Sequence, residues 1–290
     1  MSLESLTGRA YGPFQFELSA AKVADYVAAT GDDAPRWTEY APPAYAGAVL
    51  FKAAPAFLFD PEVATHARLL IHGEQFFEWP QPWRIGSQLT VRGLVYRVRE
   101  RNGVTFATFV MEASDEEDRQ VLAAKSLFLM SSDSPPGGEA SERSEPLPDE
   151  RGPNEQGRSG EFPSVDGSFV TLSKSASRAD LVRYAAASED FNPMHWDHDR
   201  AVAAGVGGVI CHGLLMAAWA TQPAAGAIDR PDPLAEARFR FRLPLPPGVP
   251  TAVVSSVTKV DGGLASVKAA VCSQDGDHMV ATLLARTGDA

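Results

Sequence analysis

Two parts of the chain show the same succession of hydrophobic patterns. Each part opens with apolar residues at helical spacing, which are Val23, Tyr26 and Val27 in the first part and Leu181 and Tyr184 in the second. Ser19 and Ser177 precede these residues, and a serine in that position caps the first turn of a helix. The pattern therefore predicts an early helix in each part.

Apolar and polar residues alternate later in each part, as they do in half-buried strands. The alternating segments are 89–95, 104–111 and 121–130 in the first part and 252–260, 264–272 and 279–284 in the second. Asn102-Gly103 and Asp261-Gly262 separate neighbouring segments, and these dipeptides tolerate the positive φ of a tight hairpin. We therefore expect an antiparallel meander in each part.

A strongly apolar segment, residues 208–220, lies between the early helix and the meander of the second part. Past Gly213 it is apolar on nearly every side. A helix without a polar face must be buried, and the meander is the available cover. A sheet wrapped around one central helix is the hot-dog arrangement, so we expect an α+β double hot-dog fold with one such unit in each half.

A polar stretch joins the two parts. Between residues 131 and 160 the only apolar side chains are Ala140 and Leu147, while Ser, Pro, Gly and Glu dominate. Such a segment cannot bury enough surface to offset its ordering entropy. We predict a flexible linker over residues 131–161, with an N-terminal repeat over 1–130 and a C-terminal repeat over 162–290.

Charge and length narrow the classes of partner. The chain has 290 residues and a formal net charge of −11, which disfavours nucleic acid or an anionic membrane as a partner. Its apolar runs are shorter than a bilayer span, and its first residues resemble no secretory signal. Two cysteines are too few for a disulfide framework. We expect a cytoplasmic protein, either a monomer or a homodimer.

The densest polar cluster directly follows the early helix of the second part, over residues 190–199. Asp190 and His195 lie five positions apart across an Asn-Pro turn, which lets the loop fold back and direct both side chains at one point. A carboxylate and an imidazole so placed can hold and polarise one water molecule.

This segment resembles a known signature. Residues 184–195, Tyr-Ala-Ala-Ala-Ser-Glu-Asp-Phe-Asn-Pro-Met-His, with Gly213 in the later His-Gly-Leu, resemble the motif of MaoC-like (R)-specific enoyl-CoA hydratases, also called hydratase 2. Glu189 stands where that family usually has glycine. The resemblance covers the second half closely and the first in outline, and it implies a protein of the double hot-dog type.

The resemblance implies roles for individual residues. Asp190 and His195 would form the catalytic dyad, and Asn192 would support their loop. Gly213 would offer its backbone N–H to the thioester carbonyl, which agrees with the positive dipole end of a helix that starts there. The implied reaction is reversible hydration of a trans-2-enoyl thioester to an (R)-3-hydroxyacyl thioester. It needs no cofactor other than coenzyme A or another acyl carrier as part of the substrate.

The first half serves as an internal comparison, because its helix, tyrosine and aspartate recur at one spacing in the second half. At that spacing Asp32 matches Asp190, whereas Trp37 matches His195. Tryptophan cannot accept a proton, so we expect the N-terminal repeat to be inactive. Trp37, together with Tyr184, is a candidate for the wall of the substrate pocket.

Several polar residues allow other interpretations. A divalent metal could gather at His195, Asp197, His198, Asp199 and His212, but this spacing is no standard ligand pattern and we expect no metal site. Loss of activity on chelation would revive that interpretation. Cys211 is interpreted as a small core residue and the His72-Gly73 pair as structural, while His212 stays unassigned.

Other functions remain open on the same residues. The alternation of Arg and Phe over residues 238–242 places arginines on one strand face, either solvated or against coenzyme A phosphates. Dehydration of 3-hydroxyacyl groups on acyl carrier protein would use the same dyad. A hot-dog thioesterase would release free thiol, and a non-catalytic acyl-CoA binding module would show no turnover.

Overall fold

The computed structural model describes residues 3–66, 69–131, 155 and 161–288. Its first half contains η1 (Leu3–Leu6), β1 (Ala10–Glu17), α1 (Ala20–Thr30), η2 (Ala34–Arg36), η3 (Pro43–Tyr45), α2 (Ala46–Leu58), α3 (Pro61–His66), β2 (Leu69–Glu78), β3 (Gln88–Arg101), β4 (Val104–Ser114) and β5 (Gln120–Ser131). Its second half contains β6 (Leu172–Lys174), α4 (Arg178–Ser188), η4 (Pro193–His195), α5 (His198–Ala203), α6 (Gly213–Gly226), β7 (Leu234–Phe241), β8 (Thr251–Asp261), β9 (Leu264–Ser273) and β10 (Gly276–Arg286). The η elements are short 3₁₀ helices.

The two early helices begin at the serines expected to cap them. The Ser19 hydroxyl accepts a hydrogen bond from the N–H of Lys22 at 3.3 Å in α1. Ser177 and Asp180 form a reciprocal capping box at the start of α4, in which each side chain accepts from the other residue's N–H. Such caps satisfy N–H groups that have no partner inside the helix.

Both helices also end alike, in a left-handed residue. Gly31 ends α1 with φ of 62°, and Glu189 ends α4 with φ of 61°. This conformation favours glycine, which explains why a glycine is usual where this chain has Glu189. The Glu189 carboxylate lies 2.7 Å from Nζ of Lys22 on α1, so the glutamate that replaces the usual glycine links the two helices.

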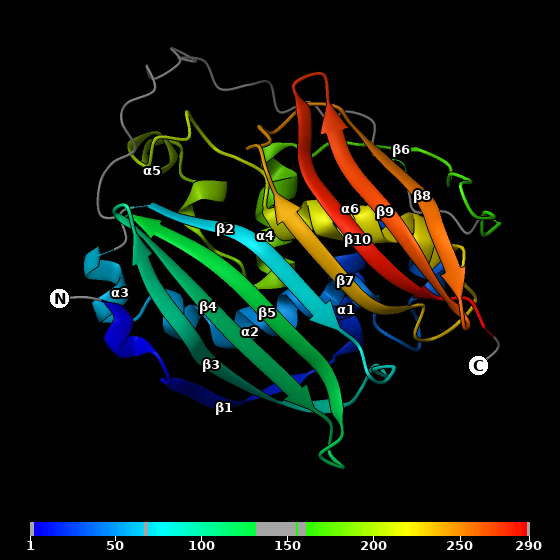
Figure 1. Ribbon diagram of the computed structural model, residues 1–290, viewed down its shortest axis with the longest axis horizontal. Helices are drawn as coiled ribbons and strands as arrows, with labels where there is room; N and C mark the ends of the chain where they lie inside the picture. The colour runs from blue at the N-terminus through cyan, green and yellow to red at the C-terminus, as the bar shows by residue number, and fades with distance from the viewer. Residues whose placement is uncertain (1–2, 67–68, 132–154, 156–160, 289–290) are drawn as a thin grey trace.

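The strands in the described ranges form one ten-stranded sheet in the order β1-β3-β4-β5-β2-β7-β10-β9-β8-β6. The predicted meanders are β3-β4-β5 and β8-β9-β10, and both are antiparallel. The halves meet where β2 pairs with β7, with Phe77 opposite Ala237. Figure 1 shows these two strands side by side at the centre of the sheet.

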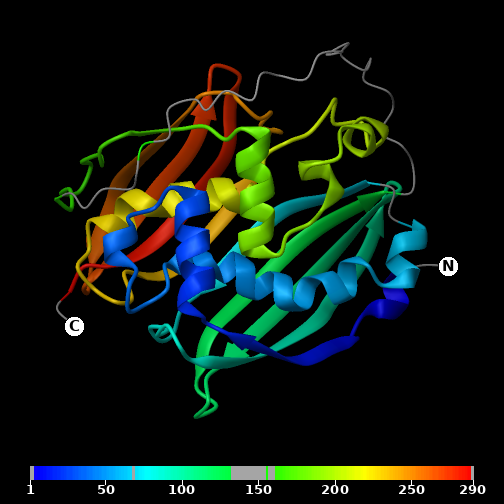
Figure 2. The same cartoon turned by 180° about the vertical axis from the view of Figure 1, so that it is seen from behind.

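Each half of the sheet curves around one helix, α2 in the first half and α6 in the second (Figure 2). The thirteen residues of α6 that follow Gly213 are all buried, as its all-round apolar character predicts. Between these helices α1 packs against α4. The chain therefore has the α+β double hot-dog fold expected from its sequence.

The predicted linker, residues 131–161, lies mostly outside the described residues. Within it, Glu155 exchanges hydrogen bonds with Ser173 on β6: its N–H donates to the Ser173 carbonyl and its carboxylate accepts from the Ser173 N–H, both at 2.9 Å. No helix in the described ranges is long and apolar enough to cross a membrane.

Candidate active site

Hydrogen bonds within the loop after α4 determine where its side chains lie. The Asn192 N–H donates to Oδ1 of Asp190 at 3.3 Å, and the Asn192 side-chain oxygen accepts from the Met194 N–H at 3.2 Å. The carbonyl of Met194 accepts from the N–H of Ile210 at 3.1 Å, which ties the loop to the segment that leads into α6. Asn192 thus braces the loop on both sides of the turn.

His195 is held in one tautomer. It is 9% exposed, and its Nδ1–H donates to the carbonyl oxygen of Ile210 at 2.8 Å. A neutral imidazole carries a single N–H, so Nε2 has a free lone pair. Burial lowers the pKa of His195 to about 4, although the bond to Ile210 opposes this shift. At neutral pH the ring is therefore an uncharged base.

The same buried environment shifts the pKa of Asp190 in the opposite direction from that of His195. The Asp190 side chain is buried, with 5% of the residue exposed. Burial raises the pKa of Asp190 to about 7, while the N–H of Asn192 stabilises the carboxylate and opposes the shift. Near neutral pH this carboxyl is therefore divided between acid and anion. Two titratable groups whose pKa values are pushed apart are a recurring arrangement for acid and base work.

His212 is a site residue whose position the sequence pattern left unassigned. Its ring stacks on that of His195 with centroids 3.8 Å apart, and its Nε2–H donates to the backbone carbonyl of Asp190 at 3.2 Å. The ring of Tyr184 also packs against that of His212, with centroids 4.8 Å apart. Its place directly before the glycine that starts α6 is the sequence signal that points to it.

Gly213 is the first residue of α6. The first N–H groups of a helix have no partner within it and lie at the positive end of its dipole. A Cβ at position 213 would lie 2.9 Å from Cε1 of Phe241 on β7, so only a residue without a side chain fits against this ring. The backbone N–H of this residue is one of the groups at the start of α6.

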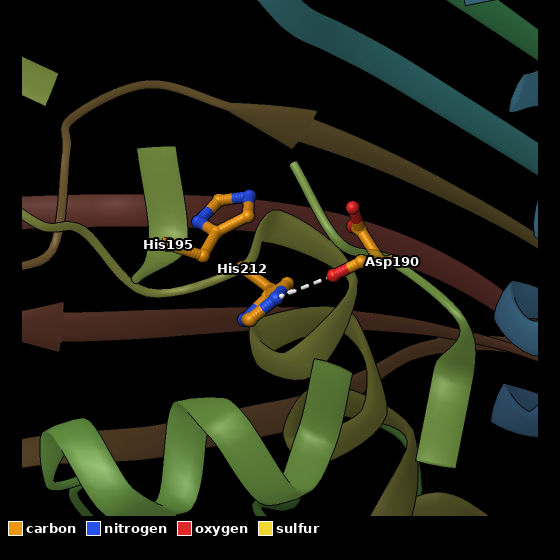
Figure 3. A group of neighbouring side chains, drawn as sticks. All are labelled: Asp190, His195 and His212. Carbon is orange, nitrogen blue, oxygen red and sulfur yellow. Dashed lines mark hydrogen bonds between the residues drawn. The ribbon is translucent and has the colours of Figure 1, made fainter. Parts of the chain in front are cut away.

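Asp190, His195 and His212 lie together, each offering an oxygen or nitrogen within 4.8 Å of the others. In Figure 3 the Asp190 carboxylate and the His195 ring lie on the same side of His212. Among the described residues, these three form the group that could hold a metal ion. Two stacked imidazoles direct their nitrogens poorly at one ion, and Nε2 of His212 is already bonded to Asp190. Asp197 instead caps α5, accepting from the Arg200 N–H.

The two candidate pocket residues lie in different places. Tyr184 is fully buried and its ring packs against that of His212, so it supports the site through His212. Trp37 is also buried, and the Arg36 guanidinium stacks on its ring at 4.8 Å. Arg36 in turn donates to the carbonyl of Ile228, just past the far end of α6. At about 1.5 Å per residue, Trp37 is therefore roughly 20 Å from the Gly213 end of that helix.

The arginines of β7 lie on the outer face of the sheet, opposite the central helix. Together with Lys268 they line a groove of about 610 Å³. Arg240 lies 3.0 Å from the Glu74 carboxylate, and Arg242 lies 3.6 Å from that of Asp277. Because both arginines already have acidic partners, this face has the properties of a solvated sheet surface.

Two family models match the chain, one in each half. The family model described as MaoC like domain matches residues 162–274. The second half of the chain is a MaoC-like domain. A model described as FAS1-like, dehydratase domain region, matches residues 5–123 of the first half. The site loop, His212 and Gly213 all lie inside the MaoC-like domain.

Curated relatives correspond to one half of the chain. A UPF0336 protein of Streptomyces coelicolor is 28% identical over 134 residues, which is 42% of this chain and 89% of that protein. A UPF0336 protein of Thermobifida fusca is 23% identical over 143 residues, covering 45% of this chain and 94% of that protein.

Solved structures resemble the whole chain, including its MaoC-like domain. A MaoC-like dehydratase superposes with a TM-score of 0.82 at 19% identity, covering 99% of this chain and all (100%) of that one. A protein of Mycobacterium tuberculosis described as having a double hotdog fold superposes with a TM-score of 0.66 at 14% identity, covering 97% of this chain and 96% of that one. At these identities the likeness shows the double hot-dog fold.

Proposed function

We propose that the MaoC-like domain is a hydro-lyase that reversibly hydrates trans-2-enoyl-CoA to (R)-3-hydroxyacyl-CoA. The observation that carries the proposal is the convergence of the Asp190 carboxyl and the His195 imidazole beside the start of α6. An acid, a base and a helix N-terminus are the three groups that addition of water to a conjugated thioester requires.

In the proposed reaction His195 is the base. Its Nε2 accepts a proton from the water whose oxygen attacks Cβ, because the bond from Nδ1–H to Ile210 leaves that lone pair free. The low pKa of His195 keeps the ring uncharged at neutral pH, so the base form is the resting form. The stacked ring of His212 holds the plane of His195 in place.

Asp190 is the proposed acid. Its pKa of about 7 leaves much of the carboxyl protonated at neutral pH, so it can donate to Cα as the new C–O bond forms. The negative charge that develops on the thioester oxygen meets the N–H of Gly213. After addition His195 carries the proton of the water and Asp190 is ionised, so transfer of one proton between them restores both groups.

In this proposal the N-terminal repeat has no catalytic role and forms part of the pocket for the acyl group. Asp32 occupies the position that corresponds to Asp190, and burial raises its pKa, but no imidazole accompanies it. Lys174, fully buried, instead donates from Nζ to the Gly31 carbonyl at 2.9 Å beside this carboxyl. Burial lowers the pKa of Lys174 to about 8, so at neutral pH most of this group is an ammonium ion, which has no lone pair to accept a proton.

The test is a spectrophotometric screen of crotonyl-CoA and longer, branched and dicarboxylic enoyl-CoA esters, with chiral analysis of the product. Asp190→Asn and His195→Gln should each lower kcat by about 10²–10⁴-fold, the usual contribution of an acid or base. Release of free thiol would instead indicate a thioesterase. Absence of turnover with all enoyl esters, on coenzyme A and on acyl carrier protein alike, would reject the proposal.

A further inference from the structure

A bulge in β2 reverses the face on which His72 lies. Along this strand Gln75 and Phe77 are buried, whereas Glu74 pairs with Arg240 on the outer face. Strict alternation would place His72 on the outer face together with Glu74. The pairing with β5 shifts at this point, however: His72 lies opposite Phe128 and Glu74 opposite Leu127, so Gly73 is left without a partner.

The extra residue turns His72 towards the core. Its ring contacts Phe128, a buried residue of β5, with centroids 4.8 Å apart. A bulge that redirects one side chain is a common feature next to an active site. Gly73 suits the bulge because a Cβ there would lie 2.5 Å from Cδ1 of Leu129.

The ring of Phe241 lies between His72 and the proposed site. On its second side the imidazole contacts Phe241 of β7, with centroids 5.1 Å apart. Phe241 is the same residue whose ring covers Gly213 at the start of α6. Desolvation, with a smaller contribution from His195, lowers the pKa of His72 to about 4, although hydrogen bonds with Gln75 and the Glu74 backbone oppose this shift. His72 is therefore an uncharged group of the first repeat beside the base of the second.

A buried polar chain fixes the orientation of this ring. The Nε2–H of His72 donates to Oε1 of Gln75 at 3.1 Å, and the Ser126 hydroxyl donates to the same oxygen at 2.6 Å. The Gln75 amide donates to the Phe76 carbonyl at 2.8 Å, which sets the direction of the amide. Gln75 and Ser126 are both fully buried. Such a network is costly to bury and holds a side chain in one position.

We infer that His72 is a positioning residue contributed by the N-terminal repeat: it fixes the ring of Phe241, which packs over Gly213 and bounds the place of the thioester in the MaoC-like domain. The inference rests on the proposed function. It gives the N-terminal repeat an indirect part in the reaction, because the ring that packs over Gly213 is then held in place by a side chain of that repeat. The role concerns the reacting end of the substrate and is independent of the length of the acyl chain.

The kinetic test compares three variants. His72→Phe keeps a ring between Phe128 and Phe241 but loses the bond to Gln75, whereas His72→Gln keeps an N–H donor, and His72→Ala removes both. His72→Ala and His72→Phe should lower kcat/KM by about 10–100-fold, since small misplacements of a reacting group have effects of that size. The loss should be equal for crotonyl-CoA and a long-chain enoyl-CoA, and His72→Gln should recover part of it.

Melting temperatures of the variants separate positioning from folding. A folded His72→Phe protein with the parent's kcat/KM would overturn the inference, since the residue would then only fill space. The same holds if the loss grows with chain length, because the contact would then be with the acyl tail.

A second measurement does not depend on turnover. Butyryl-CoA has no double bond and cannot be hydrated, so it serves as a bound probe. Histidine ring signals in ¹⁵N NMR, assigned with His72→Gln, should show the His72 signal moving when butyryl-CoA binds. Binding without movement of that signal overturns the inference even if the enzyme is active. Movement in a protein that hydrates no enoyl ester would support the inference while rejecting the proposed reaction.

Discussion

The rings of His195 and His212 stack with their centroids 3.8 Å apart. His212 also donates to the backbone carbonyl of Asp190 and directly precedes Gly213, so one side chain contacts both members of the dyad and adjoins the helix start. The proposed acid, base and oxyanion donor are thus held by a common support. Small shifts in that support should affect the chemical step more than substrate binding.

His212→Ala tests this support. The variant should lower kcat by about 10–100-fold with a smaller change in KM, because misplaced reacting groups lose rate. It should also lower the free energy of unfolding by about 1–3 kcal/mol, since the Asp190 carbonyl loses its donor. Steady-state kinetics and denaturant melts measure the two effects. An unchanged kcat in a destabilised protein would show that His212 acts only in packing.

The pH profile follows from the two shifted pKa values. The acid form of Asp190 exists below its pKa of about 7, and the basic form of His195 exists above its pKa of about 4. If Asp190 donates and His195 accepts, kcat/KM should be flat between these values and fall by about tenfold per pH unit outside them. Asp190→Asn should abolish the alkaline limb in its residual activity. A rate that rises through pH 7 would instead make the Asp190 carboxylate the base.

Gly213→Ala should disturb the start of α6. The new methyl group would lie 2.9 Å from Cε1 of Phe241, so the ring or the helix must move. The backbone N–H is kept but displaced, so we expect kcat to fall by up to about 10²–10³-fold, the effect of losing one oxyanion donor altogether. Adding Phe241→Leu, which makes room for the methyl group, should restore part of the rate. A double variant as slow as Gly213→Ala would show that the clash is not the cause.

Trp37→Phe tests the proposed role of the N-terminal repeat. Because this residue lies near the far end of α6, the variant should leave kcat/KM for crotonyl-CoA within about twofold and alter that for long-chain esters by about 10-fold or more. The measurement is a chain-length series on both proteins. Equal losses on every ester would place Trp37 outside the acyl pocket and indicate a general effect on folding.

Much of the fold could be predicted because it depends on local signals. Ser19 and Ser177 mark helix starts, and the Asn-Gly and Asp-Gly pairs mark hairpins. The all-round apolar pattern of α6 predicted its burial. These features act through neighbouring residues along the chain, so one sequence contains enough information to place them.

The parts of the site that could not be predicted depend on contacts between distant segments. The position of His72 depends on a bulge relative to β5, which no local pattern reveals. The pairing of Arg240 with Glu74 requires β7 to lie beside β2. Matching the two repeats makes Trp37 a candidate for the pocket wall, but it does not show which end of α6 this residue lies near.

The pairing of β2 with β7 has a consequence for the independence of the two repeats. Residues of β2 from Glu74 to Glu78 bond to β7 through the main chain, so removing the N-terminal repeat would turn β7 into an edge strand. The unpaired main-chain N–H and C=O groups of an exposed edge strand can pair with a strand of another chain. A fragment that begins at residue 162 should therefore self-associate in solution, and sedimentation of that fragment beside the full chain would show whether the N-terminal repeat also serves as a permanent cover of β7.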